Sequence, residues 1–222
     1  KTQDEGFPAD EFAKIGYHAI WHGQKGFNGV AILADGVAPV EVQRGLPGDP
    51  DDVQSRYLEA DVGGVRVVCI YLPNGNPVPG PKFDYKLAWM ERLRARMAHL
   101  WALEIPCAVV GDFNVIPQDK DVWSPRAMAS DALMQPESRD AYQRLLGDGW
   151  TDAINTLNPR GGVWTYWDYQ AGAWQRDHGF RIDHLLLSPE LADRLEAAGV
   201  DKEHRGREKA SDHAPVWVTL RD

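Results

Sequence analysis

The chain has few cysteines. Only Cys69 and Cys107 occur among its 222 residues, and both lie inside apolar, strand-like runs. This position favours reduced thiols in the core of a protein from a reducing compartment. A disulfide or a pair of metal-binding thiols is the alternative, but neither shows a suitable local spacing.

Long apolar runs are also missing. No stretch approaches the roughly 20 apolar residues that a membrane-spanning helix needs, and the sequence shows no signal-peptide pattern. We therefore expect a protein without membrane contact, located in the cytoplasm. The chain begins with Lys rather than Met, which indicates a processed chain or a fragment.

An excess of positive charge is absent as well. The formal net charge is −9 at pH 7. This argues against a protein that coats nucleic acid non-specifically, because such binding depends on clustered Lys and Arg. The same charge is compatible with a nuclease, since a metal-binding pocket needs carboxylates. A few local basic groups and amide donors suffice to contact phosphates.

Length and composition favour one compact domain over residues 1–222. A hydrophobic content of 43% is enough for a shared core, and no repeat or linker divides the chain. Strands outnumber helices, so we expect an α/β or α+β fold. Val-, Ile- and Leu-rich runs bounded by Gly, Pro or Asp predict strands at 27–33, 55–62, 65–72, 105–111, 182–188 and 214–220.

Helical patterns occur between some of these strands. Apolar residues recur every three or four positions at 83–103, which predicts an amphipathic helix with its Met and aromatic stripe in the core. Weaker patterns predict helices at 136–146 and at 189–198, the latter capped by Ser188. Gly63-Gly64 predicts a tight hairpin between two strands, since glycine accepts positive φ.

Three segments are predicted to be loops. The Pro- and Gly-rich segment 74–82 leaves a strand that ends near Tyr71, and the irregular segment 117–135 is long enough to suggest a functional loop. The segment 160–180 is rich in Trp, Tyr and Phe, which can stack on bases or sugars. For most of these aromatic residues, packing beneath a long loop is the favoured interpretation.

Polar side chains gather where apolar runs end. Asp112 and Asn114 follow one predicted strand, Asp183 stands at the start of another, and Asp212-His213 precede a third. Buried strands need carbon side chains, so carboxylates and imidazoles at their ends indicate a site at the edge of a sheet. Carboxylate, amide and imidazole groups together are what a metal-assisted attack on a phosphate ester requires.

Each cluster alone has an ordinary structural explanation. Asp112 is a common type of turn residue, and a single histidine such as His213 more often has a structural role. Together with Tyr71 at the end of another strand, the clusters form a set that can converge at one rim. Ser211 is a poor candidate nucleophile without a nucleophile elbow, and the chain has no P-loop, dinucleotide or zinc-finger motif.

Further motifs accompany these clusters along nearly the whole chain: His22-Gly23-Gln24-Lys25-Gly26, Tyr71-Leu72-Pro73-Asn74-Gly75, Gly111-Asp112-Phe113-Asn114-Val115, Trp167-Asp168-Tyr169, Arg181-Ile182-Asp183-His184 and Ser211-Asp212-His213-Ala214-Pro215-Val216. With them the chain resembles the exonuclease III family of DNA-repair nucleases, within the endonuclease/exonuclease/phosphatase superfamily. The Gly-Gln-Lys-Gly and Trp-Asp-Tyr motifs point to the bacterial branch of that family.

The resemblance implies a fold and an activity. The fold would be a four-layer α/β sandwich of two packed mixed β-sheets flanked by helices. The activity would be hydrolysis of the DNA backbone 5′ to abasic sites, with 3′-to-5′ exonuclease and 3′-phosphatase action, dependent on Mg²⁺ or Mn²⁺. The partner would be double-stranded DNA with abasic sites or 3′ ends. The resemblance implies no protein partner, and we expect a monomer.

The resemblance also implies roles for individual residues. Asp112 would orient or deprotonate the attacking water, and Asn114 would donate to the scissile phosphate. His213, paired with Asp183, would contact a phosphate oxygen, and Tyr71 would lie near the same phosphate.

Further residues would bind the metal and the DNA. Asp212 would hold the metal with Asp112 and Asn114, and Asn74 would contact DNA. An abasic sugar has no base to unstack, so flipping it into a pocket costs less than flipping a normal nucleotide. The residues implied to line that pocket are Tyr166, Phe180 and Ile182.

One departure from the family pattern stands at the start of the chain. Family members begin with a strand that bears an Asn and a second strand that ends near a metal-binding Glu, and Lys1-Thr2-Gln3-Asp4 resembles the sequence just after that Glu. We therefore expect an N-terminally incomplete chain with weakened metal binding and poor activity. The alternatives are a superfamily phosphoesterase with another substrate and a catalytically impaired fragment that binds DNA.

Overall fold

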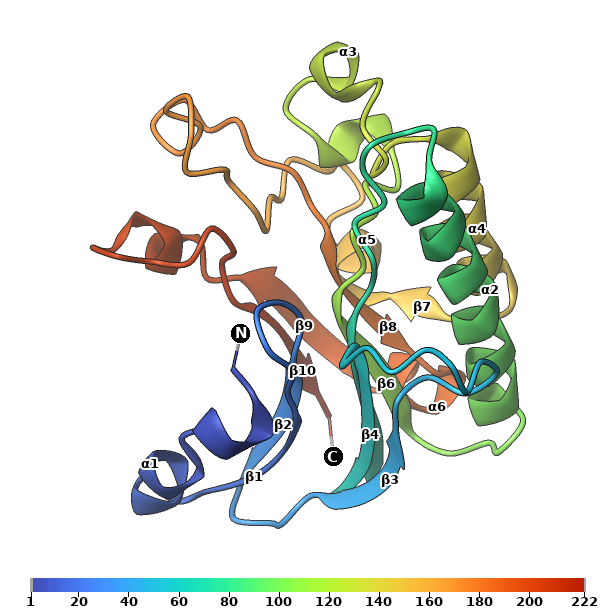
Figure 1. The fold of residues 1–222 in the computed structure, drawn as a ribbon, viewed down its shortest axis with the longest axis vertical. Helices are drawn as coiled ribbons and strands as arrows, with labels where there is room; N and C mark the ends of the chain where they lie inside the picture. Colours follow the sequence, from blue (N-terminus) through green and yellow to red (C-terminus); the bar gives the residue numbers. More distant parts are fainter. Residues whose placement is uncertain (1, 222) are drawn as a thin grey trace.

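The computed structural model describes residues 2–221 (Figure 1). At its centre lies a six-stranded mixed sheet in which β5 and β6 are parallel and the other neighbouring strands are antiparallel. A long helix connects the parallel pair, as expected for strands that a tight turn cannot join. In spatial order the strands are β3 (Val40–Arg44), β4 (Tyr57–Val62), β5 (Val65–Tyr71), β6 (Cys107–Asp112), β8 (Asp183–Leu187) and β7 (Thr151–Asp152).

Two helices, α2 (Pro81–Trp101) and α4 (Pro136–Gly147), lie side by side on one face of this sheet (Figure 1). The apolar stripe of α2 faces the sheet, where Trp89 and Leu93 are buried in one cluster with Val109 of β6. Burying side chains of this size stabilises the fold by about 1.5–3 kcal/mol each. The two helices predicted for these segments are therefore confirmed.

Two antiparallel hairpins cover the other face of the central sheet. Ile32 in the first hairpin belongs to one apolar cluster with Leu58 of β4, and the second hairpin packs around Leu185 and Leu187 of β8. The hairpins consist of β1 (Tyr17–His22) with β2 (Val30–Asp35) and of β9 (Leu195–Val200) with β10 (Val216–Leu220).

The short helix α1 (Ala9–Lys14) lies beyond β1, and Phe7, just before this helix, stacks on Trp21 of β1 with 4.4 Å between ring centroids. Helices, central sheet, hairpins and α1 follow one another as layers, so the predicted α/β fold with mixed sheets flanked by helices is confirmed. Among the described residues, the second sheet layer consists of two separate hairpins. The remaining elements are α1 (Ala9–Lys14), α3 (Pro125–Met128), α5 (Ala153–Leu157), α6 (Pro189–Ala192), η1 (Asp4–Gly6), η2 (Asp119–Asp121) and η3 (Lys202–Gly206).

The segment after β8 differs from its prediction. The sequence predicts a helix at 189–198, but α6 ends at Ala192 and the chain then forms β9 against β10. Pairing with a neighbouring strand outweighs the helix preference of the local Glu and Ala residues. Ser188 stands at the N-cap of α6, but its hydroxyl accepts from Cys107 N and donates to the carbonyl oxygen of Ile105 instead of capping the helix.

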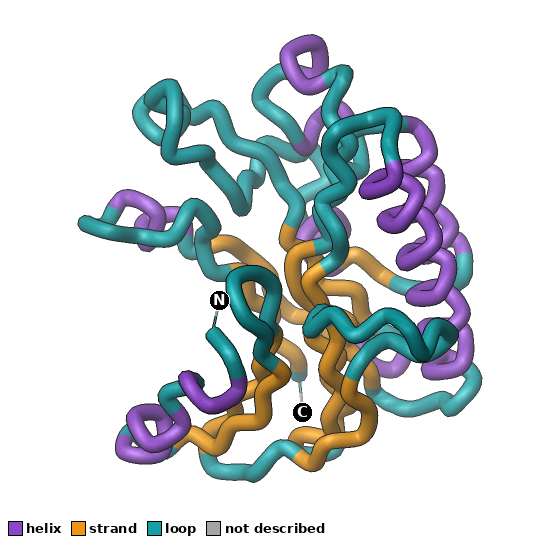
Figure 2. The backbone as a smooth tube through the Cα atoms, viewed as in Figure 1, coloured by secondary structure: helices purple, strands orange, loops and turns teal. Residues whose placement is uncertain are grey.

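Most of the predicted turns and loops are observed, although the segment 117–135 contains the short helices η2 and α3, and α2 begins within the segment 74–82. Gly63 and Gly64 have φ values of 55° and 86°, which confirms the tight hairpin between β4 and β5. Figure 2 shows the longest loops gathered at one end of the sheets. No helix in residues 2–221 is long and apolar enough to cross a membrane.

Candidate active site

Three polar residues lie next to one another where the central strands meet the loops. Asp112, the last residue of β6, is in register with Tyr71 of β5 on one side and with Asp183 of β8 on the other. Residues in register on neighbouring strands direct their side chains to the same face of a sheet. The register therefore brings together three of the residues that the strand-end motifs singled out.

The residue before Asp112 in β6 is a glycine, Gly111, and the position of Asp112 at this edge depends on it. Gly111 has a φ of 135°, a backbone angle that residues with a side chain rarely adopt. A Cβ atom built at this position would lie 2.1 Å from the carbonyl oxygen of Ile70 on the neighbouring strand. Any larger residue would push β5 and β6 apart beside Tyr71 and Asp112.

His213 reaches the site from the loop that precedes β10. Its Nδ1 lies 2.8 Å from Oδ2 of Asp183, and its ring packs edge-to-face with Tyr166, at 5.0 Å between centroids. Burial opposes the charged ring, but the hydrogen bond and the charge of Asp183, with two further carboxylates, raise the pKa of His213 to about 9. His213 is therefore an imidazolium and a hydrogen-bond donor at neutral pH.

Asp112 is oriented by Asn114. The backbone N–H of Asn114 donates to Oδ1 of Asp112 at 2.8 Å, and its side-chain amide donates to Oδ2 at 3.1 Å. Burial, followed by the charge of Asp183, raises the pKa of Asp112 to about 7. A carboxylate of this pKa suits proton transfer near neutral pH, because general base catalysis is most efficient when pKa and pH match.

The side chain of Asn114 is engaged within the protein. Besides Asp112, its amide donates to a backbone carbonyl oxygen, and its oxygen accepts from Asn74 at 3.0 Å. Asn74 also accepts from Asn76, whose amide donates to Asp131. These bonds show that Asn114 orients Asp112 and links it to the loop that carries Asn74.

Lys86 joins three loops behind this network. Its side chain on α2 is fully buried, and Nζ donates to the carbonyl oxygens of Asn74 at 3.1 Å, Asn114 at 2.6 Å and Ala132 at 3.5 Å. Burial lowers the pKa of Lys86 to about 7, against the opposing effect of nearby carboxylates. One side chain thus sets the relative positions of the loops that carry two predicted site residues.

Lys86→Met should loosen these loops. We expect the free energy of unfolding to fall by about 1–3 kcal/mol, because buried carbonyl oxygens lose their donor. We also expect kcat to fall, since Asn114 would no longer be fixed against Asp112. Denaturant unfolding and steady-state kinetics measure the two effects. The matched control is Lys82→Met, at an exposed lysine one turn earlier on α2, and equal effects of the two variants would contradict this role.

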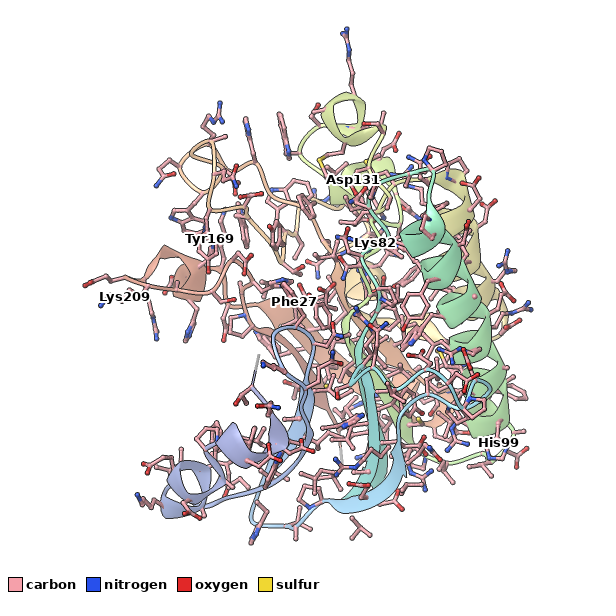
Figure 3. All side chains as sticks on the ribbon, in the orientation of Figure 1. Phe27, Lys82, His99, Asp131, Tyr169 and Lys209 are labelled. Carbon is pink, nitrogen blue, oxygen red and sulfur yellow. The ribbon has the colours of Figure 1, made fainter. Side chains whose placement is uncertain are left out.

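A cavity of about 620 Å³ opens over these residues. Asp183 lines an adjoining cavity together with Asp112 and His213. Figure 3 shows Asp131 and Tyr169 on loops at this end of the molecule, whereas His99 marks the opposite end. The predicted site residues that line the main cavity are Tyr71, Asn74, Asp112, Asn114, Tyr166, Phe180, Ile182, Asp212 and His213.

The cavity offers few ligands for a metal. Within residues 2–221 no group of three or more His, Cys, Asp or Glu side chains could hold an ion by itself. Asp112 and Asp212 nevertheless line the same cavity. Two carboxylates that leave the other positions to water and phosphate fit Mg²⁺, whereas a closed zinc site needs four protein ligands.

The sequence profile of the Endonuclease/Exonuclease/phosphatase family matches residues 2–213. The chain belongs to this family. It is 34% identical to exodeoxyribonuclease III of Haemophilus influenzae, over 100% of this chain and 87% of that protein. The predicted resemblance to the exonuclease III family is confirmed.

Solved structures show the same similarity. The 3′ phosphatase NExo from Neisseria, bound to a product DNA hairpin, matches with a TM-score of 0.95 and 38% identity, over 99% of this chain and 85% of that one. An AP endonuclease from Archaeoglobus fulgidus matches with a TM-score of 0.94 and 34% identity, over the same shares of the two chains. These similarities extend over nearly all of the described fold.

This family member also has cavity residues that the motifs do not single out. They come from the segments 117–135 and 160–180, whose length and aromatic content were the only available signals. Within the second segment, Trp167 is buried, donates to Asp177 and packs against Trp174, as expected for loop packing. The additional lining residues include Trp123, Met128, Asp131, Leu133, Arg176 and His178.

Proposed function

We propose that this family member is a metal-dependent DNA-repair nuclease. It hydrolyses the phosphodiester 5′ to abasic sites and acts on 3′ ends as an exonuclease and a phosphatase. The observation that supports the proposal is that Asp112 and His213 line one cavity, with Asp183 bonded to His213 and in register with Asp112. The relatives named exodeoxyribonuclease III, 3′ phosphatase and AP endonuclease support DNA as the substrate class.

Asp112 is the residue that takes the proton of the attacking water. Asn114 holds both of its oxygen atoms, so the carboxylate keeps one orientation toward the cavity. Its pKa, raised by burial to about 7, makes it a stronger base than an exposed aspartate while it is still ionised in part at neutral pH. The water then attacks the phosphorus in line with the 3′ oxygen, whose bond to phosphorus breaks, and this oxygen takes up a proton from water to become a 3′ hydroxyl.

His213 and Tyr71 stabilise the phosphate as its negative charge grows. The imidazolium of His213 donates to a phosphate oxygen, and Asp183 keeps the ring charged and oriented. Burial, followed by the charge of Asp112, raises the pKa of Tyr71, so its hydroxyl stays protonated and can donate to the same group. Donors fixed in a partly dry pocket are worth more than donors in water.

Mg²⁺ or Mn²⁺ is the proposed cofactor. Asp212 and Asp112 would hold the ion, and the side-chain oxygen of Asn114, which here accepts from the amide of Asn74, would be a further ligand. When bound, the ion supplies positive charge that offsets the charge on the phosphate and on the leaving oxygen. The oxygen-only character of these ligands matches a hard divalent ion.

The sugar at the cleaved position is proposed to enter a pocket beside two aromatic side chains that pack against each other. Tyr166 and Phe180 pack together at 4.7 Å between ring centroids, and Ile182 lies in the same apolar cluster. An abasic sugar reaches such a pocket without the cost of unstacking a base. Asn74 would contact the DNA backbone nearby. We also propose that the protein acts as a monomer in the cytoplasm.

Removal of divalent ions should abolish cleavage. With EDTA we expect turnover of duplex DNA to fall at least about 10²-fold, because the ion supplies several kcal/mol of transition-state stabilisation. Asp212→Asn should raise the Mg²⁺ concentration required for half-maximal rate. Asp193→Asn, at an exposed carboxylate, serves as the control and should leave that concentration unchanged.

The substrate panel decides between the proposal and its alternatives. The panel comprises an abasic duplex, a duplex with a free 3′ end, a duplex with a 3′ phosphate, and a non-DNA phosphoester. Cleavage of the DNA substrates supports the proposal. Turnover of the non-DNA ester alone would contradict it, and tight DNA binding without cleavage would indicate a catalytically impaired fragment.

A further inference from the structure

Two aromatic rings form a stacked pair in the lining of the cavity. The rings of Trp123 and His178 are parallel within 2°, with 3.7 Å between their centroids. Both residues line the cavity, and 39% of Trp123 is exposed. The exposed indole is a flat apolar surface beside the cavity, and it has no role in the proposed mechanism.

The backbone holds this pair in place. The N–H of Trp123 donates to the carbonyl oxygen of Gly179 at 3.0 Å, and Val122 forms an antiparallel bridge with Phe180. A Cβ atom at Gly179 would lie 2.6 Å from the indole nitrogen of Trp167, so this segment rests directly on a buried side chain. The stacked pair is therefore fixed before any ligand arrives, which lowers the entropy cost of binding on it.

The same bridge places the pair beside the proposed sugar pocket. Phe180, which bridges to Val122, also packs on Tyr166. Phe180, which lines the pocket, and Trp123, which carries the indole, thus lie on two segments joined by backbone hydrogen bonds. Because Trp123, Tyr166 and Phe180 line the same cavity, a nucleotide whose sugar lies against Tyr166 and Phe180 can extend its base toward Trp123.

We propose that Trp123, backed by His178, is a stacking platform for the base of the 3′-terminal nucleotide. The proposal rests on the proposed nuclease function and adds a specificity determinant to it. Aromatic side chains stack on bases of any sequence, so the platform binds a terminal nucleotide without reading its identity. An abasic sugar and a 3′ phosphate have no base at this position and gain nothing from the indole.

The test compares substrates with and without a base at the reacting position. For Trp123→Ala we expect KM for removal of a normal 3′ nucleotide to rise about tenfold, the effect of losing one stacked base, with kcat unchanged. Incision at an abasic site and removal of a 3′ phosphate should change less than about twofold. Trp123→Phe should restore most of the affinity, because it keeps a stacking surface.

A binding measurement makes the result independent of catalysis. A duplex with 2-aminopurine as its 3′-terminal base, bound in EDTA, should lose fluorescence on the wild-type chain and keep it on Trp123→Ala. Trp101→Ala removes another exposed tryptophan, at the far end of α2, and should behave like the wild type. Equal losses on all substrates, or quenching that survives Trp123→Ala, would overturn the proposal. Failure of the wild-type chain to cleave any DNA would overturn the nuclease function. The fluorescence measurement would still show whether the terminal base stacks on Trp123.

Discussion

Asp112→Asn is expected to lower kcat for DNA hydrolysis by about 10³-fold while leaving DNA binding nearly unchanged. An amide cannot take the proton of the attacking water, and a positioned general base contributes about 10²–10⁴-fold. The substitution keeps the size of the side chain, and its single oxygen can still accept one of the two bonds that Asn114 donates to Asp112. Single-turnover kinetics with excess protein measure the loss at the chemical step.

A matched carboxylate separates this effect from a change of net charge. Asp84 on α2 is exposed and lies away from the cavity lining, so Asp84→Asn should keep full activity. The stability of Asp112→Asn should not fall, since its raised pKa shows that the charged form is unfavourable in the folded site. Retention of more than about a tenth of the rate in Asp112→Asn would remove the general base from the mechanism.

His213→Asn is expected to lower kcat by about 10²–10³-fold, because a fixed donor to the developing charge is lost. The activity should also depend on pH through this residue. With its pKa raised to about 9, the imidazolium persists through neutral pH and is lost as the pH rises through that value. The rate should therefore fall on the alkaline side of pH 9.

Asp183→Asn should move this alkaline fall to lower pH. Asp183 is the main group that raises the pKa of His213 against burial, so its removal lets burial dominate. The same sign applies to stability. The stabilisation from the charged pair is complete below the ordinary histidine pKa of about 6.5 and disappears as the pH rises toward 9. Profiles of kcat/KM against pH for the wild type and for Asp183→Asn measure the shift.

The pair should also act as a unit. His213→Asn combined with Asp183→Asn should cost little more than His213→Asn alone, because Asp183 works through the ring. Fully additive losses would show that Asp183 serves the reaction by a separate route. An unchanged alkaline limb in Asp183→Asn would likewise contradict the role assigned to the pair.

Much of the fold and most of the site could be predicted from local sequence. Strand ends are marked by an abrupt change from apolar to polar residues, so Asp112 and Asp183 were visible as edge residues. Their convergence depends on register, which the motifs do not encode, and here Asp112 is in register with both Tyr71 and Asp183. The family resemblance supplied that missing step.

Other features depend on contacts between distant segments and left no local signal. The residues of β9 favour a helix by themselves, and only pairing with β10 makes them a strand. Lys86 sits in an ordinary helical pattern, yet its partners are carbonyl oxygens on three loops. The stack of Trp123 on His178 joins two irregular segments whose conformations no periodicity describes.

The most direct test of the proposed hydrolysis follows the oxygen atom of the attacking water. An abasic duplex is cleaved under single-turnover conditions with Mg²⁺ in water enriched in oxygen-18, and the product ends are examined by mass spectrometry. Attack on phosphorus predicts one labelled oxygen in the 5′ phosphate that carries the abasic sugar and an unlabelled 3′ hydroxyl on the other strand end. Asp112→Asn should form neither product at a comparable rate. An unlabelled phosphate beside an unsaturated sugar would show elimination instead of hydrolysis and would contradict the account.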